Sequence, residues 1–185
     1  VTRGLEGRRL TALRALARAG AAAFSDDGRP VMNAELMRRA LVAGKELGLP
    51  VLDHAEDDHL TGAGVVSEGR SSRRLGVPGI PSASEALMAL RDIALCELTG
   101  GALHLCHVSC AETVELVRDA KKRAGRVTAE AAPHHFTLTD ADIPRRGPRA
   151  ADFKMKPPLR GRADCEALRR GLADGTIDAI ATDHA

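Results

Sequence analysis

Histidine and aspartate side chains stand directly after the apolar segments of this 185-residue sequence. Imidazole nitrogen and carboxylate oxygen are ligands that zinc binds at about 2 Å. A bound metal lowers the pKa of its water toward neutrality and polarises a carbonyl group, which hydrolysis of an unreactive amide requires. The residue types and their positions therefore predict a zinc-dependent hydrolytic site. The residues at these positions are Asp26, Asp27, His54, His107, His134, His135 and Asp183.

The elements that must position these side chains are short strands. Apolar segments span residues 21–24, 49–52, 102–106, 127–131 and 177–181. Between them, apolar residues recur every three to four positions, as they do in amphipathic helices. This alternation predicts βαβ units around a parallel sheet. The polar residues that follow the strands then converge at the carboxyl ends of the sheet.

The choice of α/β fold is narrowed by the motifs that are missing. No GxGxxG or GxxxxGK[ST] motif follows a strand, so a nucleotide-binding fold would lack its phosphate loop. A (β/α)₈ TIM-type barrel remains, with catalysis at its C-terminal mouth and typically about 250 residues. We therefore expect residues 1–185 to be one incomplete catalytic domain, a partial barrel with roughly strands 4 to 8.

The composition excludes several classes of protein. Lys and Arg total 27 against 25 Asp and Glu, and the chain has no Trp, no Tyr and three Phe, which argues against a nucleic-acid-binding surface. No apolar run approaches the roughly 20 residues of a membrane span, and no signal-type segment is present. The four cysteines form no CxxC pair and indicate buried thiols of a cytoplasmic protein.

Three helix starts are expected from capping residues. Asn33 is the predicted N-cap of the helix that follows it. Two residue pairs match the capping-box pattern: Ser82 with Glu85, and Ser109 with Glu112. In this pattern the two side chains accept hydrogen bonds from free backbone N–H groups at the start of the same helix.

Further expectations concern a helix, a loop and a histidine. Leu87, Leu90 and Leu98 follow Ser82 at helical spacing and predict a helix. Gly and Ser dominate residues 61–82, which predicts a long loop. His104 lies three positions before His107, so on a strand the two point to opposite faces, and we expect His104 to face the helices.

Six short motifs, in order, resemble those of class I (bacterial-type) dihydroorotases of the amidohydrolase superfamily. Any one motif is weak, but their ordered combination covers essentially the whole chain. They are residues 24–28 (FSDDG), 53–57 (DHAED), 104–109 (HLCHVS), 133–135 (PHH), 157–160 (PPLR) and 181–185 (ATDHA).

The resemblance implies roles for individual residues. Asp27 stands where related amidohydrolases use a carboxylated lysine, and His54 and His107 resemble the histidines that bind the second zinc. Asp183 resembles the residue that holds a zinc and shuttles a proton to the leaving amide nitrogen. The implied reaction is the reversible cyclisation of N-carbamoyl-L-aspartate to dihydroorotate in pyrimidine biosynthesis, with two zinc ions in a complete site. A homodimer or an association with aspartate transcarbamoylase is implied as well.

The sequence departs from the family pattern at three places. The HxH motif of the first strand is absent, so we expect this segment to be inactive alone. The Pro-His that the family places after residue 185 is absent too. Lys156 stands where the family usually has Asn before Pro-Pro-Leu-Arg. An ammonium group only donates, so Lys156 is a candidate for binding the substrate carboxylate.

Two alternatives stay open at this stage. Another cyclic amidohydrolase, such as a dihydropyrimidinase, hydantoinase or allantoinase, resembles the same barrel but uses a carboxylated lysine where this chain has Asp27. A non-catalytic scaffold subunit of aspartate transcarbamoylase would have lost its metal ligands, whereas this chain retains Asp27, His54, His107 and Asp183.

Overall fold

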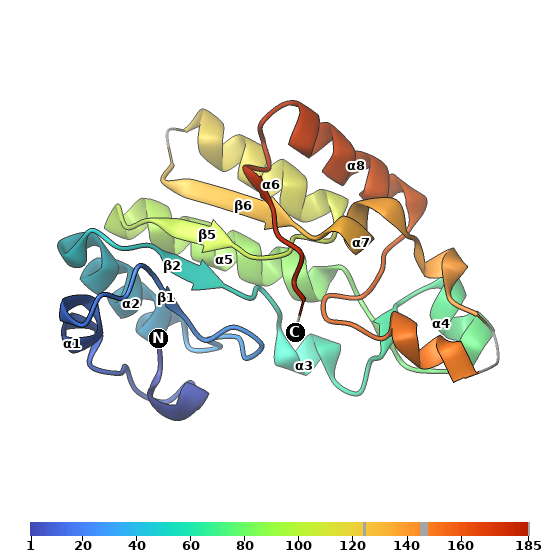
Figure 1. The fold of residues 1–185 in the computed structure, drawn as a ribbon, viewed down its shortest axis with the longest axis horizontal. Coiled ribbons are helices and arrows are strands. Elements are labelled where there is room, and N and C mark those ends of the chain that lie inside the picture. Colours follow the sequence, from blue (N-terminus) through green and yellow to red (C-terminus); the bar gives the residue numbers. More distant parts are fainter. Residues whose placement is uncertain (124, 145–147, 185) are drawn as a thin grey trace.

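A five-stranded parallel sheet forms the centre of the molecule (Figure 1). The computed structural model describes residues 1–123, 125–144 and 148–184. The order of the strands is β1-β2-β5-β6-β7, so each strand lies beside the next predicted one. Their bounds are Phe24–Ser25, Val51–Asp53, Leu103–Leu105, Val127–Ala131 and Ala179–Ile180. The predicted parallel α/β architecture is therefore confirmed, with strands mostly shorter than the apolar segments.

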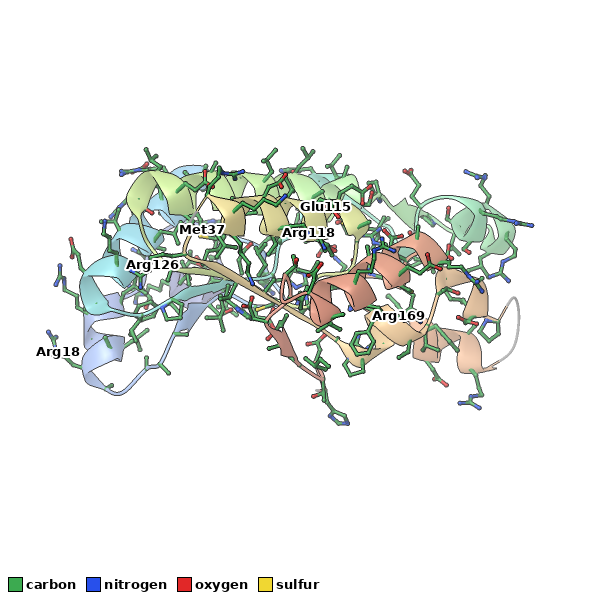
Figure 2. The ribbon with its side chains drawn as sticks, turned by 90° about the horizontal axis from the view of Figure 1, so that it is seen from above. Arg18, Met37, Glu115, Arg118, Arg126 and Arg169 are labelled. Carbon is green, nitrogen blue, oxygen red and sulfur yellow. The ribbon has the colours of Figure 1, made fainter. Side chains whose placement is uncertain are left out.

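Helices cover one face of this sheet, as the view from above shows (Figure 2). The alternate strand residues Leu103 and Leu105 are buried against Met37, Leu41 and other helix residues. The helices that pack here, α2, α5, α6 and α8, span Ala34–Leu47, Ala83–Thr99, Ala111–Lys122 and Arg162–Ala173. Within the described residues no helix covers the opposite face. Ile180, on the edge strand β7, is 59% exposed.

Shorter elements complete the chain. In the described part, no helix is both long enough and apolar enough to cross a membrane. The shorter helices are η1 Arg3–Leu5, α1 Leu13–Arg18, α7 Pro133–Thr137, η2 Asp140–Asp142 and η3 Pro148–Phe153.

The expected long loop at residues 61–82 is wrong. This segment contains the end of α3 Asp58–Thr61, then β3 Val66–Ser67, α4 Arg70–Leu75 and β4 Gly79–Ile80, and β3 pairs with β4 in a small parallel sheet. Glycine permits this close pairing because a Cβ atom at Gly64 would lie 2.8 Å from the Gly79 carbonyl oxygen. The glycines that suggest a loop therefore serve backbone packing instead.

Helix α5 buries a different face from the one its leucines mark. Leu87, Leu90 and Leu98 are 53%, 48% and 71% exposed. The buried face carries Asp92 and Glu85 in addition to apolar residues. These carboxylates have partners elsewhere in the fold, so tertiary contacts override the apolar pattern.

The Asn33 cap is confirmed, since its side chain accepts hydrogen bonds from the Glu35 and Leu36 backbone N–H groups. Both capping boxes are wrong, because their members pair across the two helices. Ser82 donates to Glu112 at 3.1 Å, and the Ser109 backbone N–H donates to Glu85 at 3.0 Å. The capping residues of α5 and α6 are thus exchanged between these adjacent helices.

Candidate metal centre

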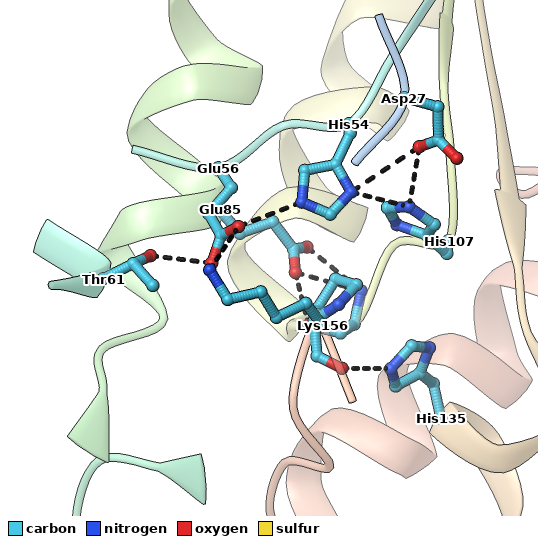
Figure 3. Close-up of polar contacts among 10 residues, drawn as sticks. Asp27, His54, Glu56, Thr61, Glu85, His107, His135 and Lys156 are labelled. Atoms are coloured by element: carbon cyan, nitrogen blue, oxygen red, sulfur yellow. Dashed lines mark hydrogen bonds and ion pairs between the residues drawn. The ribbon is translucent and has the colours of Figure 1, made fainter. Parts of the chain in front are cut away.

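Three predicted ligands come together at the carboxyl ends of neighbouring strands (Figure 3). Asp27 lies two residues after β1, His54 directly follows β2, and His107 lies two residues after β5. Both histidines are buried, whereas the Asp27 side chain is about half exposed. Parallel pairing of β1, β2 and β5 sets the three side chains side by side.

The distances among the three ligand atoms fit a metal ion. His54 Nδ1 lies 2.9 Å from His107 Nε2. Asp27 Oδ1 lies 3.6 Å from His54 Nδ1 and 3.4 Å from His107 Nε2. Two ligands about 2.1 Å from a tetrahedral zinc ion lie roughly 3.4 Å apart. The donor set, two imidazole nitrogens and one carboxylate oxygen, is also one that suits zinc.

The charges of the cluster reinforce one another. Contact with the His107 ring lowers the pKa of Asp27, which keeps this carboxylate ionised. Burial alone would lower the pKa of His107, but the carboxylates of Asp27 and Asp183 together raise it. Asp27 and Asp183 therefore place negative charge beside His107, which attracts a cation.

Asp183 lies close to this cluster but outside its three-ligand group. It follows β7 and is exposed, and its charge acts on the pKa values of both His107 and Cys106. Asp183 and His107 share an unusual backbone, with φ angles of 52° and 36°. Left-handed positions in non-glycine residues are uncommon and cluster at functional sites. The metal-binding and catalytic roles of Asp183 remain predictions.

Glu56 is a site residue that the motif analysis missed. Its carboxylate lies 3.0 Å from His54 Nε2, 2.8 Å from the Thr61 hydroxyl, which donates to it, and 3.3 Å from Lys156 Nζ. Burial would raise the pKa of Glu56, but the contacts with His54, Thr61 and Lys156 lower it to about 2. Its position two residues after His54 was the one feature of the sequence that could have indicated a contact with this histidine.

Lys156 reaches the site from the segment before Pro157. Its ammonium contacts Glu56, and its side chain is about half exposed at the edge of the cluster. The contact of Lys156 with a substrate carboxylate remains a prediction.

His135 holds the same segment, because its Nε2 lies 2.9 Å from the Pro157 carbonyl oxygen. Burial lowers the pKa of His135 to about 4, so this ring is neutral and donates.

His104, Cys106 and Glu130 form a second group with metal-binding atoms. The expectation that His104 faces the helices is wrong, because Leu103 and Leu105 occupy that face and strand side chains alternate. His104 is already satisfied by Thr128 at 2.8 Å and Glu130 at 3.1 Å. Burial raises the pKa of the Cys106 thiol, which disfavours a thiolate ligand. This group is therefore the weaker metal candidate.

Comparison with known proteins agrees with this geometry. A family described as "Dihydro-orotase-like" matches residues 1–113. A dihydroorotase of Anaeromyxobacter sp. (strain K) is 55% identical over the whole chain, and one of Syntrophobacter fumaroxidans is 54% identical. In both cases the 185 residues span 42% of the relative's length.

Solved structures share the fold. A D-hydantoinase (dihydropyrimidinase) from Thermus sp. superposes with a TM-score of 0.78 at 27% identity, covering 93% of this chain and 39% of that one. A D-hydantoinase from Bacillus sp. AR9 gives 0.77 at 26% identity, covering 91% and 38%. This likeness confirms the expected partial barrel of the amidohydrolase kind. Together with the matched residues 1–113, it shows that the chain belongs to the dihydro-orotase-like family.

Proposed function

We propose that the full-length protein is a zinc-dependent dihydroorotase, which closes N-carbamoyl-L-aspartate to dihydroorotate and reopens the ring. The observation that carries this proposal is the arrangement of Asp27, His54 and His107, whose ligand atoms lie 2.9–3.6 Å apart. The relatives at 54–55% identity, which bear the name dihydroorotase, support the same substrate.

Each residue of the site has a role in this proposal. Asp27, His54 and His107 would hold one ion of a two-zinc site, and Asp183 would bind from the end of β7. Zinc, when bound, supplies a Lewis acid for the scissile carbonyl and lowers the pKa of water. Asp183 would accept the proton of the attacking water and return it to the leaving amide nitrogen. Lys156 would bind the substrate carboxylate.

The replacement Asp183→Asn in the full-length protein tests the proton-transfer role. An amide is a poor base, so we expect the variant to retain zinc but lose most turnover. Zinc content is measured by elemental analysis, and turnover is measured by following dihydroorotate in both directions. Asp174→Asn, an exposed position after α8, is the control with normal turnover. Near-normal rates in Asp183→Asn would exclude the role.

A second cyclic amidohydrolase activity is the alternative, since the superposed structures are hydantoinases at 26–27% identity. Asp27, in place of a carboxylated lysine, favours dihydroorotate. Turnover of dihydrouracil, hydantoin or allantoin without turnover of dihydroorotate would establish the alternative.

We further propose a cytoplasmic location and assembly as a homodimer or with aspartate transcarbamoylase. Gel filtration with and without that enzyme would test the assembly.

A further inference from the structure

The two ring nitrogens of His54 face different surroundings. Nδ1 points to the cluster, 2.9 Å from His107 Nε2 and 3.6 Å from the Asp27 carboxylate. Nε2 points away from it, to a Glu56 carboxylate oxygen 3.0 Å away (Figure 3). A neutral imidazole carries one N–H donor and one acceptor, while an ionised carboxylate only accepts. Glu56 therefore places the His54 proton on Nε2 and leaves the Nδ1 lone pair toward the cluster.

Two further side chains hold the Glu56 carboxylate in this position. Thr61, at the end of α3, donates its hydroxyl to Oε1 at 2.8 Å. Lys156 approaches Oε2, the same oxygen that faces His54, at 3.3 Å from a segment 100 residues away in sequence. Glu56 itself is 5% exposed, so water does little to compete for its oxygens.

The neighbouring ligand lacks this support. His107 presents Nε2 to the cluster, but its Nδ1 is buried with no hydrogen-bond partner among the residues that the structure describes. The two histidines therefore differ in how their rings are oriented. His54 has a fixed carboxylate behind it, and carboxylates in this relation to a metal-binding histidine set its tautomer and raise its basicity.

We propose that Glu56 is a positioning residue of the metal centre: it fixes the tautomer of His54 that offers Nδ1 to the ion, and Thr61 and Lys156 hold it in place. This inference rests on the metal centre of the proposed function and is independent of the substrate. It gives Lys156 a contribution to zinc binding in addition to its proposed contact with substrate.

Zinc affinity of the full-length, metal-stripped protein tests this role by competition with a chromogenic chelator. We expect Glu56→Gln to weaken zinc binding about 10–100-fold, the usual effect of removing such a partner. Glu35→Gln is the matched control, because Glu35 is an exposed glutamate paired with Arg38 on α2. The zinc affinity of this variant should equal that of the unaltered protein. Lys156→Met should weaken binding less than Glu56→Gln does.

A spectroscopic measurement separates orientation from general stability. In ¹⁵N–¹H spectra of the metal-free protein, His54 should be protonated at Nε2, and Glu56→Gln should populate both tautomers. Zinc affinity and a His54 tautomer that both stay unchanged in Glu56→Gln would overturn the inference. If that variant does not fold, Thr61→Val applies the same test, because it removes the hydroxyl that holds the Glu56 carboxylate. An unchanged zinc affinity in Thr61→Val would contradict the inference. Failure of the unaltered protein to bind zinc would instead refute the proposed metal centre.

Discussion

His107 holds its imidazole in the cluster from a backbone position with a φ angle of 36°. A non-glycine residue in such a conformation costs about 1–3 kcal/mol, which surrounding contacts must offset. Val108 supplies one such contact, because its backbone N–H donates to the Glu130 carbonyl oxygen at 2.8 Å. At the residue scale, part of the folding free energy thus maintains the direction of one predicted metal ligand.

The charge of Asp27 should be measurable at His107. Because Asp27 helps to raise the pKa of His107, Asp27→Asn should lower that pKa in the metal-free protein. NMR titration of the His107 ring measures it. Asp58→Asn, an exposed carboxylate at the start of α3, is the control and should leave His107 unchanged. An unaltered titration in Asp27→Asn would contradict the described contact.

His135 predicts a pH dependence of stability. Its folded pKa of about 4 lies below the ordinary 6.5, so the unfolded chain binds more protons between these values. The stabilisation is complete above pH 6.5 and is lost as the pH falls toward 4, at most about 3 kcal/mol. His135→Gln keeps an N–H donor for Pro157 but does not titrate, so its free energy of unfolding should fall less over this range.

Urea unfolding from pH 7.5 to 4.5 provides the measurement for His135. The difference in free energy of unfolding between the native protein and His135→Gln should shrink steadily as the solution is acidified. His59→Gln, which changes an exposed histidine of α3, should follow the native curve. Parallel curves for His135→Gln would rule out the buried neutral ring.

At the scale of elements, Arg160 joins three segments beneath the site. Its guanidinium donates to the Ile80 carbonyl oxygen at the end of β4 and to the Ser109 hydroxyl, at 2.7 Å and 3.2 Å. Ser109 in turn binds Glu85 of α5, and both charged side chains are buried. The segment of His107 is thereby tied to α5 and to the segment that carries Lys156.

Removal of one charge from this network should be strongly destabilising. Arg160→Met leaves the buried Glu85 carboxylate without its counter-charge, so we expect a loss of about 3–5 kcal/mol in the free energy of unfolding. Chemical denaturation measures the loss. The double replacement Arg160→Met with Glu85→Leu should lose less than the sum of the two single replacements. Arg162→Met, which changes an exposed side chain at the start of α8, should lose little. Additive single losses would show that the two charges act independently.

The sequence was informative where one segment determines its own structure. Five strands, the Asn33 cap and the grouping of Asp27, His54 and His107 follow from apolar segments and the residues at their ends. The exchanged caps could not be predicted, because their partners lie 24 to 30 residues away in the chain. Glu56 stands close to His54 in sequence, but its contact with Lys156, 100 residues away, appears only in the folded molecule. The buried face of α5 was hidden for the same reason, since its carboxylates are satisfied only in the folded molecule.

At the scale of the whole molecule, the sheet is covered on one side only in the described residues (Figure 2). Strands β1 and β7 are its two edges, and Ile180 of β7 is exposed. Exposed edges and apolar side chains promote pairing with other chains. The superposed hydantoinase from Thermus sp. is longer, since this chain covers 39% of it.

Residues 1–185 produced alone should therefore self-associate. We expect sedimentation velocity to show concentration-dependent oligomers and an apolar dye to bind at the exposed edge strand β7. Ile180→Lys places a charge on the edge strand and should reduce both effects. A monomeric chain that binds no dye would show that this exposed edge does not promote self-association.

The exchange of capping residues between α5 and α6 bears on how the molecule opens. Ser82 relies on Glu112, and Ser109 relies on Glu85, so fraying of either first turn removes a partner from the other. The two turns should consequently open in a single event, and their amide protons should exchange with deuterium at a common free energy. Since Ser109 lies two residues beyond His107, the joint opening of both turns should also release the segment that holds this histidine.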